Sequence, residues 1–451
     1  MGSGGNRQNR SVTRRDFLKK TSAVAGVAGL APAVSAPFVS SALAQTKTLK
    51  IIQWSHFIPE YDKWIDGFTR EWGKKNGVAV TIDHIPHLEL PARAAAEVAA
   101  GAGHDIFGFN GSGGPHLYAK HAHDLTALIK EVEAKHGKVL PMGRQIAWNG
   151  DTNSWSAFPD YFIDFPGLYR KDLWDEIGMT PETWEDVRVG GAKLKQKGYP
   201  VGIALSHCVD ANNSYRGMLW SHGAAECDET GKRVTIDSKE TLEVVKYVRA
   251  LYKEAMDPEI LSWDDAGNNR FLASGRGSWI HNPISAYRSI QKSNPQLADK
   301  IQLWRTPAGT VRRLTAGAPN SYIIWKFARN KETAVEFLKH YADHYADAFK
   351  ASTGYDHPLF ANMVPKPMPI LSNDPSSHPP DKLKVLETAD EWCAVFGYPG
   401  PSTPAADEVA DNFIIPDMMA NAATDKMTPE DAVKWATKEI ELIYGKWATR
   451  T

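Results

Sequence analysis

The sequence has little cysteine, only three residues among 451, and none of them forms a closely spaced pair. Structural zinc sites use pairs such as C-x-x-C, so this class of site is not expected here. Cys208 and Cys227 could form one disulfide bridge in an oxidising compartment, which would leave Cys393 over. Three unpaired and mostly buried thiols are the alternative, and the sequence leaves both open.

An excess of one charge is also missing, since 52 basic residues face 53 acidic ones. This balance gives no reason to expect nucleic acid as a partner. The sequence contains no G-x-S-x-G, H-E-x-x-H, Walker or dinucleotide-binding pattern, which argues against the common hydrolases and nucleotide-binding proteins. His116, His121 and His123 lie close in sequence, but the last two would diverge by about 200° on a helix. No metal and no cofactor are therefore expected.

The first forty-four residues are expected to be an export signal rather than part of the fold. Thr13-Arg-Arg-Asp-Phe-Leu-Lys19 matches the twin-arginine pattern, and Ala42-Leu-Ala44 supplies a small-x-small cleavage site. The apolar stretch between them is too weak and too short for a stable membrane span. We therefore expect a mature protein in the periplasm, exported by the twin-arginine pathway.

A chain of this length is too long for one compact core, and two α/β lobes are the natural expectation. Residues 48–54, 78–82 and 105–110 are expected to be strands, with helices from Pro59 and over residues 90–100 between them. This rhythm predicts a parallel sheet, whose strands end together at one edge where ligands collect. The residues that it places at this edge are Trp54, His56, Asn110 and Ser112.

A segment at residues 157–186 combines several uncommon features. Ala157-Phe-Pro precedes an aromatic strand, followed by Tyr169-Arg-Lys-Asp-Leu-Trp and then by Thr180-Pro-Glu-Thr-Trp-Glu-Asp. Thr180 is expected to cap a helix that begins at Pro181. The combination resembles the family 1 extracellular solute-binding proteins of ABC importers, which include the maltose and glycerol-phosphate receptors. In that family the segment is the first hinge strand between two lobes, beside the ligand.

Three later motifs resemble the same family, in the same order. They are Phe271-Leu-Ala-Ser-Gly-Arg-Gly-Ser-Trp279, Asn330-Lys-Glu-Thr-Ala-Val-Glu-Phe-Leu and Met427-Thr-Pro-Glu-Asp-Ala. In the last motif Thr428 is expected to cap a helix together with Asp431. Residues 231–237, which lie between residue 186 and the first of these motifs, are expected to form a hairpin.

The resemblance implies an α/β fold of the periplasmic binding protein type, with two α/β lobes joined by three hinge crossings in a type II-like arrangement. It places residues 45–158 and 308–360 in one lobe. Residues 159–307 and 361–451 form the other lobe. A run rich in proline, serine and aspartate at residues 352–404 is expected to be an ordered loop.

Binding a sugar requires aromatic faces for stacking and polar side chains that donate and accept hydrogen bonds. Besides the four residues at the sheet edge, we expect ligand contacts from positions in the family motifs and around them. These are Asp160, Tyr161, Asn213, Tyr215, Trp279, Asn282, Asn320, Tyr322 and Trp392. Trp279 is the first choice, with core packing as its alternative reading. Asp160 with Asp164, or Asp264 with Asp265, could be read as a glycosidase pair, but no second feature supports catalysis.

The expected function is a monomeric receptor that closes on a small carbohydrate or polyol and delivers it to the membrane permease of an ABC importer. It is not expected to be an enzyme. One alternative is a receptor of the same fold for a polyamine or a phosphorylated polyol; clustered acids would favour the amine, and arginines the phosphate. The other is an exported enzyme acting on polysaccharide.

Overall fold

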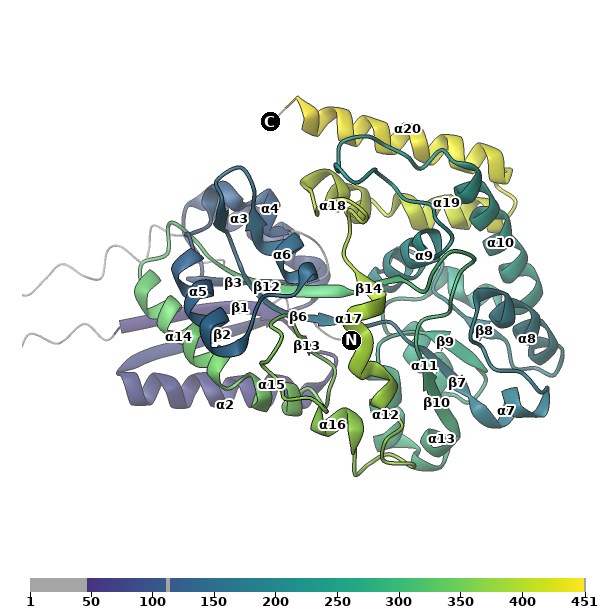
Figure 1. Cartoon of the computed structure of the whole chain (residues 1–451), viewed down its shortest axis with the longest axis horizontal. Helices are drawn as coiled ribbons and strands as arrows, with labels where there is room; N and C mark the ends of the chain where they lie inside the picture. The colour runs from purple at the N-terminus through teal and green to yellow at the C-terminus, as the bar shows by residue number, and fades with distance from the viewer. Residues whose placement is uncertain (1–46, 111–113, 450–451) are drawn as a thin grey trace, which may run out of the picture. The chain divides into compact units, whose positions relative to one another are not determined.

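The computed structural model describes residues 47–110 and 114–449, so Ser112 and the expected export signal lie outside the described residues. Its largest sheet has six strands in the order β13-β6-β12-β3-β1-β2 (Figure 1). These strands are β1 (Lys47–Trp54), β2 (Val78–Ile85), β3 (Ile106–Asn110), β6 (Phe158–Ile163), β12 (Ala318–Ile324) and β13 (His357–Pro358). The second sheet has four strands in the order β10-β7-β9-β8, namely β10 (Ile301–Trp304), β7 (Gly167–Arg170), β9 (Trp279–His281) and β8 (Val201–Gly202).

Helices connect and cover these strands, and short strands and 3-10 turns complete the chain. The α-helices are α2 (Pro59–Asn76), α3 (Leu90–Ala100), α4 (Gly114–Leu117), α5 (Thr126–His136), α6 (Pro141–Ala147), α7 (Lys171–Glu176), α8 (Trp184–Gln196), α9 (Val209–Ser221), α10 (Lys239–Ala255), α11 (Gly267–Ala273), α12 (Ser285–Ser293), α13 (Pro295–Lys300), α14 (Lys331–Asp343), α15 (Tyr345–Ala351), α16 (Pro369–Ser372), α17 (Ala389–Trp392), α18 (Pro404–Asp411), α19 (Ile414–Ala423) and α20 (Pro429–Ala448). The 3-10 turns are η1 (His87–Glu89), η2 (Ala119–His121), η3 (Pro258–Ser262) and η4 (Lys384–Thr388). Two small sheets pair β4 (Trp148–Asn149) with β5 (Ser154–Trp155), and β11 (Thr315–Ala316) with β14 (Cys393–Ala394).

The first part of the six-stranded sheet follows the predicted strand and helix rhythm. Strand β1 pairs in parallel with β2 and with β3, and the intervening helices make the crossovers. Helix α2 buries Tyr61, Ile65 and Trp72 on one face, and Gly77 ends it with a φ of 65° in the left-handed region. The expected α/β fold is confirmed.

Strand β12 is inserted between β3 and β6 and runs antiparallel to both. Its register sets Asn320 opposite Asn110 on one side and opposite Tyr161 on the other. Because β1, β3 and β6 all run toward the same edge, their last residues and the first residues of β12 meet there. This edge is where the sequence places the ligand.

The chain changes sheets between Ile163 and Gly167, because β6 pairs with β12 while β7 pairs with β9 and β10. The lobe boundary expected at residues 158 and 159 therefore precedes the observed change of sheet. Strand β6 is buried at every position, which explains why its hydrophobic run gave no sign of where the sheet ends.

The structure corrects one local expectation and confirms another in a shorter form. The helix after the Thr-Pro-Glu-Thr run begins at Trp184, and its cap is Thr183 rather than Thr180. The Thr183 hydroxyl accepts a hydrogen bond from the Asp186 backbone N–H, and the Asp186 carboxylate accepts one from the Thr183 N–H, so the pair forms a capping box. Residues 231–235 return antiparallel on residues 226–228 through one bridge between Cys227 and Val234, so the expected hairpin is present but too short to form named strands.

Two further expectations concern the cysteines and the C-terminal helix. All three cysteines are free and buried, which confirms the unpaired alternative. Thr428 caps α20 by accepting a hydrogen bond from the Asp431 N–H, as expected. In residues 47–110 and 114–449, no helix combines the length and the apolar character that crossing a membrane requires.

Candidate functional site

The candidate site begins at the edge of the six-stranded sheet, where β1 ends at Trp54. The Trp54 indole Nε1 donates a hydrogen bond of 2.7 Å to the hydroxyl of Tyr161 on β6. The Asn320 amide on β12 donates one of 3.0 Å to Asp160 Oδ2. Tyr322 on β12 donates one of 2.8 Å to the side chain of Gln53. These bonds tie three strands together just below the edge.

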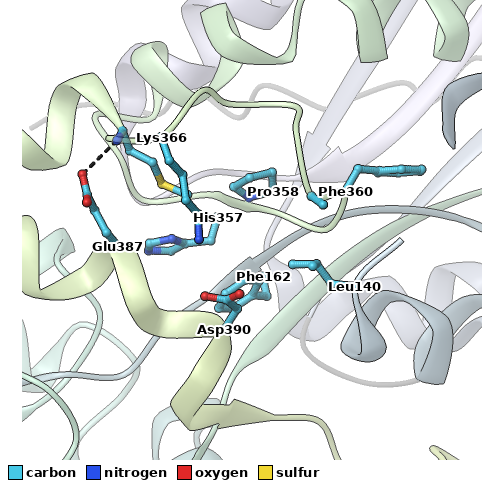
Figure 2. A pocket seen from close by; sticks show the side chains of 10 residues that line it. Leu140, Phe162, His357, Pro358, Phe360, Lys366, Glu387 and Asp390 are labelled. Atoms are coloured by element: carbon cyan, nitrogen blue, oxygen red, sulfur yellow. Dashed lines mark hydrogen bonds between the residues drawn. The ribbon is translucent and has the colours of Figure 1, made fainter. Parts of the chain in front are cut away.

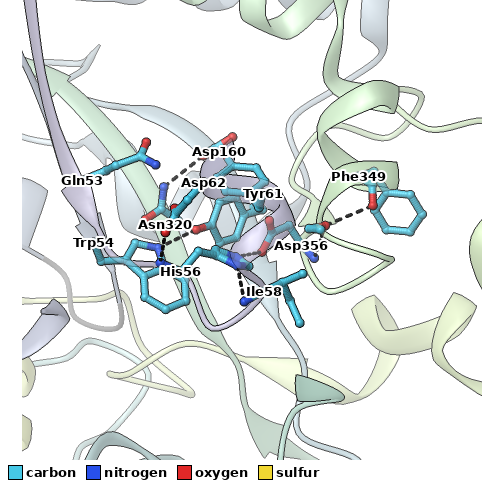
Figure 3. Close-up of polar contacts among 12 residues, drawn as sticks. Gln53, Trp54, His56, Ile58, Tyr61, Asp62, Asp160, Asn320, Phe349 and Asp356 are labelled. Atoms are coloured by element: carbon cyan, nitrogen blue, oxygen red, sulfur yellow. Dashed lines mark hydrogen bonds and ion pairs between the residues drawn. The ribbon is translucent and has the colours of Figure 1, made fainter. Parts of the chain in front are cut away.

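His56 follows β1 and extends this network to a distant part of the chain. Its Nδ1 accepts a hydrogen bond of 2.9 Å from the Ile58 N–H, so the proton of the neutral ring is on Nε2. Nε2 lies 3.1 Å from Asp356 Oδ1 and donates to it. Figure 3 shows His56 and Asp356 turned toward each other beside Trp54 and Tyr61. Asp356 Oδ2 is buried and has no hydrogen-bond partner among the described residues.

Asp160 lies deeper in the sheet than His56 and is fully buried. Burial raises the pKa of Asp160 well above its ordinary value, and the nearby Asp356 carboxylate raises it further. Hydrogen bonds from Tyr341 and Asn320 oppose this shift only in part. The raised pKa favours the neutral form of Asp160, which suits a structural hydrogen bond better than a charged contact.

A second group of polar residues comes from the loops and helices around the four-stranded sheet. Asp265, before α11, accepts a hydrogen bond of 3.2 Å from the Asp210 N–H at the start of α9. Asn268 donates one of 2.5 Å to Asp210 Oδ2 and another to Asn282 Oδ1. Burial raises the pKa of Asp210 well above its ordinary value, and the Asp265 charge adds to the rise.

One contact joins the two groups directly. His87 follows β2 in the six-stranded sheet, and its Nε2 lies 3.1 Å from Asp265 Oδ2. The His87 ring also packs at 6.2 Å from Trp54 and at 6.0 Å from Phe57. Trp54 and His87 thus stand between the edge of the six-stranded sheet and the carboxylates near the other sheet.

Tyr355 supplies a second link. Its ring lies 5.2 Å from the His56 ring, and the carboxylates of Asp210 and Asp356 both act on its hydroxyl. Burial raises the pKa of Tyr355 well above its ordinary value, so the side chain is a neutral phenol. We refer to the connected group as the acidic aromatic cluster, and it consists of Trp54, His56, His87, Asp210, Asp265, Tyr355 and Asp356.

The predicted contacts fall into two sets. One set gathers at the edge of the six-stranded sheet or joins the network across from it, and it comprises Trp54, His56, Asn110, Asp160, Tyr161, Asn282, Asn320 and Tyr322. The other set is buried elsewhere around the second sheet and its helices, and it comprises Asn213, Tyr215, Trp279 and Trp392. For both sets, the role as ligand contacts stays a prediction.

Trp279 illustrates the second set. Its side chain is fully buried, and its ring packs at 6.0 Å from Trp184 and at 6.1 Å from His281. A Cβ added to Gly167 on the neighbouring strand would come within 2.8 Å of the Trp279 indole nitrogen. These are the contacts of a core residue. Trp392 is similar, since it is buried and donates its indole N–H to Thr388 at 3.3 Å.

Sequence reasoning missed His87, Asp210, Asp265, Tyr355 and Asp356 as members of the site. Asp265 was noticed only as a neighbour of Asp264, which the structure places on the surface in an ion pair with Arg270. Asp210 lies three residues before the predicted Asn213, and its position at the start of a helix was the available signal. Asp356 lies in the proline-rich run, where no local pattern distinguished it.

Two cavities lie away from this cluster. The smaller, of about 90 Å³, lies beside β6 and β13, and Figure 2 shows its lining. It is lined by Leu140, Phe162, His357, Pro358, Phe360, Ala361, Lys366, Met368, Glu387 and Asp390, and by none of the predicted contacts. A wider groove of about 470 Å³ lies between the end of α2 and α14.

Comparison by sequence with curated proteins finds no match. Among solved structures, a maltose-bound MalE3 from T. maritima superposes with a TM-score of 0.73 at 20% identity, covering 88% of this chain and 99% of the other. A sugar transporter from Arthrobacter chlorophenolicus A6 with bound laminaribiose gives 0.73 at 15% identity, with 88% and 98% covered. A solute-binding protein from Agrobacterium radiobacter K84 in complex with ribitol gives 0.71 at 17% identity, with 88% and 98% covered.

These likenesses establish the fold. The family model described as bacterial extracellular solute-binding protein matches residues 58–346, which is more than half of the chain. The match includes the hinge segment around residues 157–186 and two of the three later motifs. The chain belongs to the bacterial extracellular solute-binding protein family.

Proposed function

We propose that this protein is the substrate-binding receptor of an ABC importer, and that it captures a small carbohydrate or polyol and delivers it unchanged to a permease. The observation that carries the proposal is a chain of contacts between the surroundings of the two sheets. The Trp54 ring packs against His87, and His87 bonds to Asp265. Similar structures hold maltose, laminaribiose and ribitol, which are neutral polyhydroxyl compounds.

The proposed mechanism is closure of two lobes around the ligand. The lobes are those expected from the sequence, residues 45–158 with 308–360 and residues 159–307 with 361–451, and their boundary falls at the start of β6. A ligand that contacts both sheets binds the closed state better than the open one and so shifts the equilibrium toward closure. Hydrogen bonds to buried hydroxyl groups give selectivity, and aromatic faces give affinity.

The proposal includes the route and the partner. Residues 1–44 direct the chain through the twin-arginine pathway to the periplasm, where the mature receptor acts as a monomer and docks on its permease. Membership in a family of extracellular proteins supports an exported location.

Of the alternatives, a phosphorylated ligand has the least support. Among the described residues, neither lysine nor arginine bonds to a member of the acidic aromatic cluster. A phosphate would meet carboxylates with no cation to offset them. An exported polysaccharide enzyme is separated from a receptor by incubating the protein with oligosaccharides, because only the enzyme forms new products.

The test is a thermal-shift screen of the mature protein against neutral sugars, polyols, glycerol phosphates and polyamines. A receptor for carbohydrate is stabilised by at least one sugar or polyol, since a ligand that binds only the folded state raises the melting temperature. Glycerol phosphate serves as the matched charged control for glycerol. Stabilisation by glycerol phosphate alone, or turnover of an oligosaccharide, would contradict the proposal.

A further inference from the structure

We infer that the ligand of this receptor is a small polyhydroxyl compound that carries a protonated amine, and that the acidic aromatic cluster holds the amine. This inference rests on the proposed function, because it assigns the chemistry of the same site. Four observations carry it: the charge of the cluster, an acceptor without a donor, the aromatic faces, and an unpartnered donor at the sheet edge.

The first observation is the charge. Asp210, Asp265 and Asp356 are each at most 9% exposed. The Asp210 N–H donates to Asp265, and the carboxylates of Asp210 and Asp356 both act on the Tyr355 hydroxyl. Among the described residues, no lysine or arginine hydrogen-bonds or ion-pairs with them. Buried carboxylates are normally paired with cations, so this arrangement lacks its partner.

The two histidines of the cluster do not supply enough positive charge to balance these carboxylates. His56 faces Asp356, but its Nδ1 accepts from the Ile58 N–H, which fixes the neutral tautomer. His87 faces Asp265 and can supply one positive charge at most. Burial raises the pKa of Asp210 and favours its neutral form, so the charge lies on Asp265 and Asp356. These two carboxylates face at most one imidazolium, and a cationic ligand would restore the balance.

The second observation is an acceptor that has no donor. Asp356 Oδ1 is taken by His56, whereas Asp356 Oδ2 is buried without a hydrogen-bond partner among the described residues. The side chain is 1% exposed and turns toward His56 (Figure 3). Leaving such an oxygen unpaired is costly, and an ammonium group offers three donors and no competing acceptor.

The third observation is the pair of aromatic faces. Trp54 lies 4.5 Å from His56, and Tyr355 lies 5.2 Å from the same ring, measured between ring centroids. Indole and phenol faces attract cations, and enclosed sites use them to bind ammonium groups. The same faces stack on the C–H surface of a sugar ring, so they serve both parts of the ligand.

The rest of the edge suits hydroxyl groups. Asn110 Nδ2 is a buried donor without a partner in the part of the chain that the structure describes, and it is positioned opposite Asn320 in the sheet. A hydroxyl oxygen can accept from it, whereas an ammonium cannot. The ligand therefore needs both an amine and hydroxyl groups, which excludes a plain polyamine.

The experiment is a calorimetric titration of the mature protein with three matched sugars: glucose, glucosamine and N-acetylglucosamine. They share one ring, and only glucosamine carries a positive charge, while the acetyl group keeps the nitrogen and removes the charge. We expect glucosamine to bind at least about tenfold more tightly than the other two, the size of effect that a buried charge contact gives.

The outcomes separate this inference from the proposed function. Neutral sugars or polyols that bind as well as glucosamine overturn the inference and leave the receptor for carbohydrate in place. Binding of spermidine without any sugar overturns both, as does a lack of binding across sugars, amino sugars and polyols.

A variant locates the charge contact. Asp356→Asn keeps the shape of the side chain and removes its charge, so the preference for glucosamine over N-acetylglucosamine should fall about tenfold or more. Asp381→Asn makes the same chemical change at an exposed position and should leave the preference unchanged. An unaltered preference in Asp356→Asn, with circular dichroism showing a folded protein, would contradict the assignment of Asp356.

Discussion

At the scale of single residues, the burial of Trp279 favours core packing over ligand contact, and a variant can test which role it has. Its ring is enclosed by Trp184 and His281, so Trp279→Ala should lower the free energy of unfolding by about 3–5 kcal/mol, the usual cost of emptying such a site. Trp279→Phe keeps most of the packing and should retain the ligand-induced thermal shift. Urea unfolding measures the first effect and calorimetry the second. Loss of ligand binding in a folded Trp279→Phe protein would make Trp279 a ligand contact after all.

The buried His281 makes the free energy of unfolding depend on pH. Burial lowers the pKa of His281 from 6.5 to about 3, and its ring nitrogens lie 2.8 Å from the Ser214 hydroxyl and 3.0 Å from that of Thr306. As the pH falls, His281 is protonated near pH 6.5 in the unfolded chain but only near pH 3 in the folded chain. Stability is therefore present above pH 6.5 and is lost as the pH falls toward 3, with a slope of up to about 1.4 kcal/mol per pH unit.

His281→Gln removes this titration and should flatten the pH dependence of the unfolding free energy between pH 6.5 and 4. The measurement is urea unfolding at several pH values, and the slope is compared rather than the absolute stability. His207→Gln is the matched control, because the His207 side chain is 60% exposed. A slope that is equally steep in His281→Gln and the unaltered protein would show that another group carries the acid sensitivity.

At the scale of elements, the cap of α8 shows how a distant contact decides between two local signals. Thr180 is followed by proline, which favours it as a cap, and Thr183 has Asp186 three residues on, which favours it equally. The Trp184 N–H donates to the Ala308 carbonyl at 3.0 Å, and Thr183 forms a bridge with Ala308. This pairing keeps the chain extended through Thr183, so the helix cannot begin earlier.

The two threonines provide a matched pair of variants. Thr183→Ala should lower the free energy of unfolding by about 1 kcal/mol, because it leaves the Asp186 N–H without its partner. Thr180→Ala should change it by less than about 0.5 kcal/mol, since Thr180 is exposed. The urea midpoint measures both. Equal losses at the two positions would show that both threonines hold the start of the helix.

Elements with a clear local pattern could be predicted, and elements that exist only because of a distant partner could not. The run from β1 to β3 follows from hydrophobic spacing and from Gly77 and Gly101, which end its helices. Strand β13 has two residues and exists only because β6 lies beside it. The same limit applies to the site: Trp54 ends a recognisable strand, whereas Asp356 is brought to His56 across 300 residues of chain.

At the scale of the whole molecule, two polar side-chain contacts connect the surroundings of the two sheets. His87 pairs with Asp265 at 3.1 Å, and Glu60 on α2 pairs with Lys292 on α12 at 2.7 Å. The second pair is roughly half exposed on both sides and adds about 0–1 kcal/mol. The first is more buried and belongs to the acidic aromatic cluster, so its effect on closure should be larger.

If the two sheets belong to lobes that open and close, Asp265→Asn should favour the open state, because it weakens the contact to His87 and leaves that imidazole facing a neutral amide. Small-angle X-ray scattering without ligand should then give a larger radius of gyration than for the unaltered protein. Lys339→Ala is the control, since Lys339 pairs with Glu131 between two helices, α14 and α5, that contact each other. Removal of that pair should leave the scattering unchanged. Identical scattering for Asp265→Asn and the unaltered protein, with and without ligand, would mean that this contact does not hold the two sheets together.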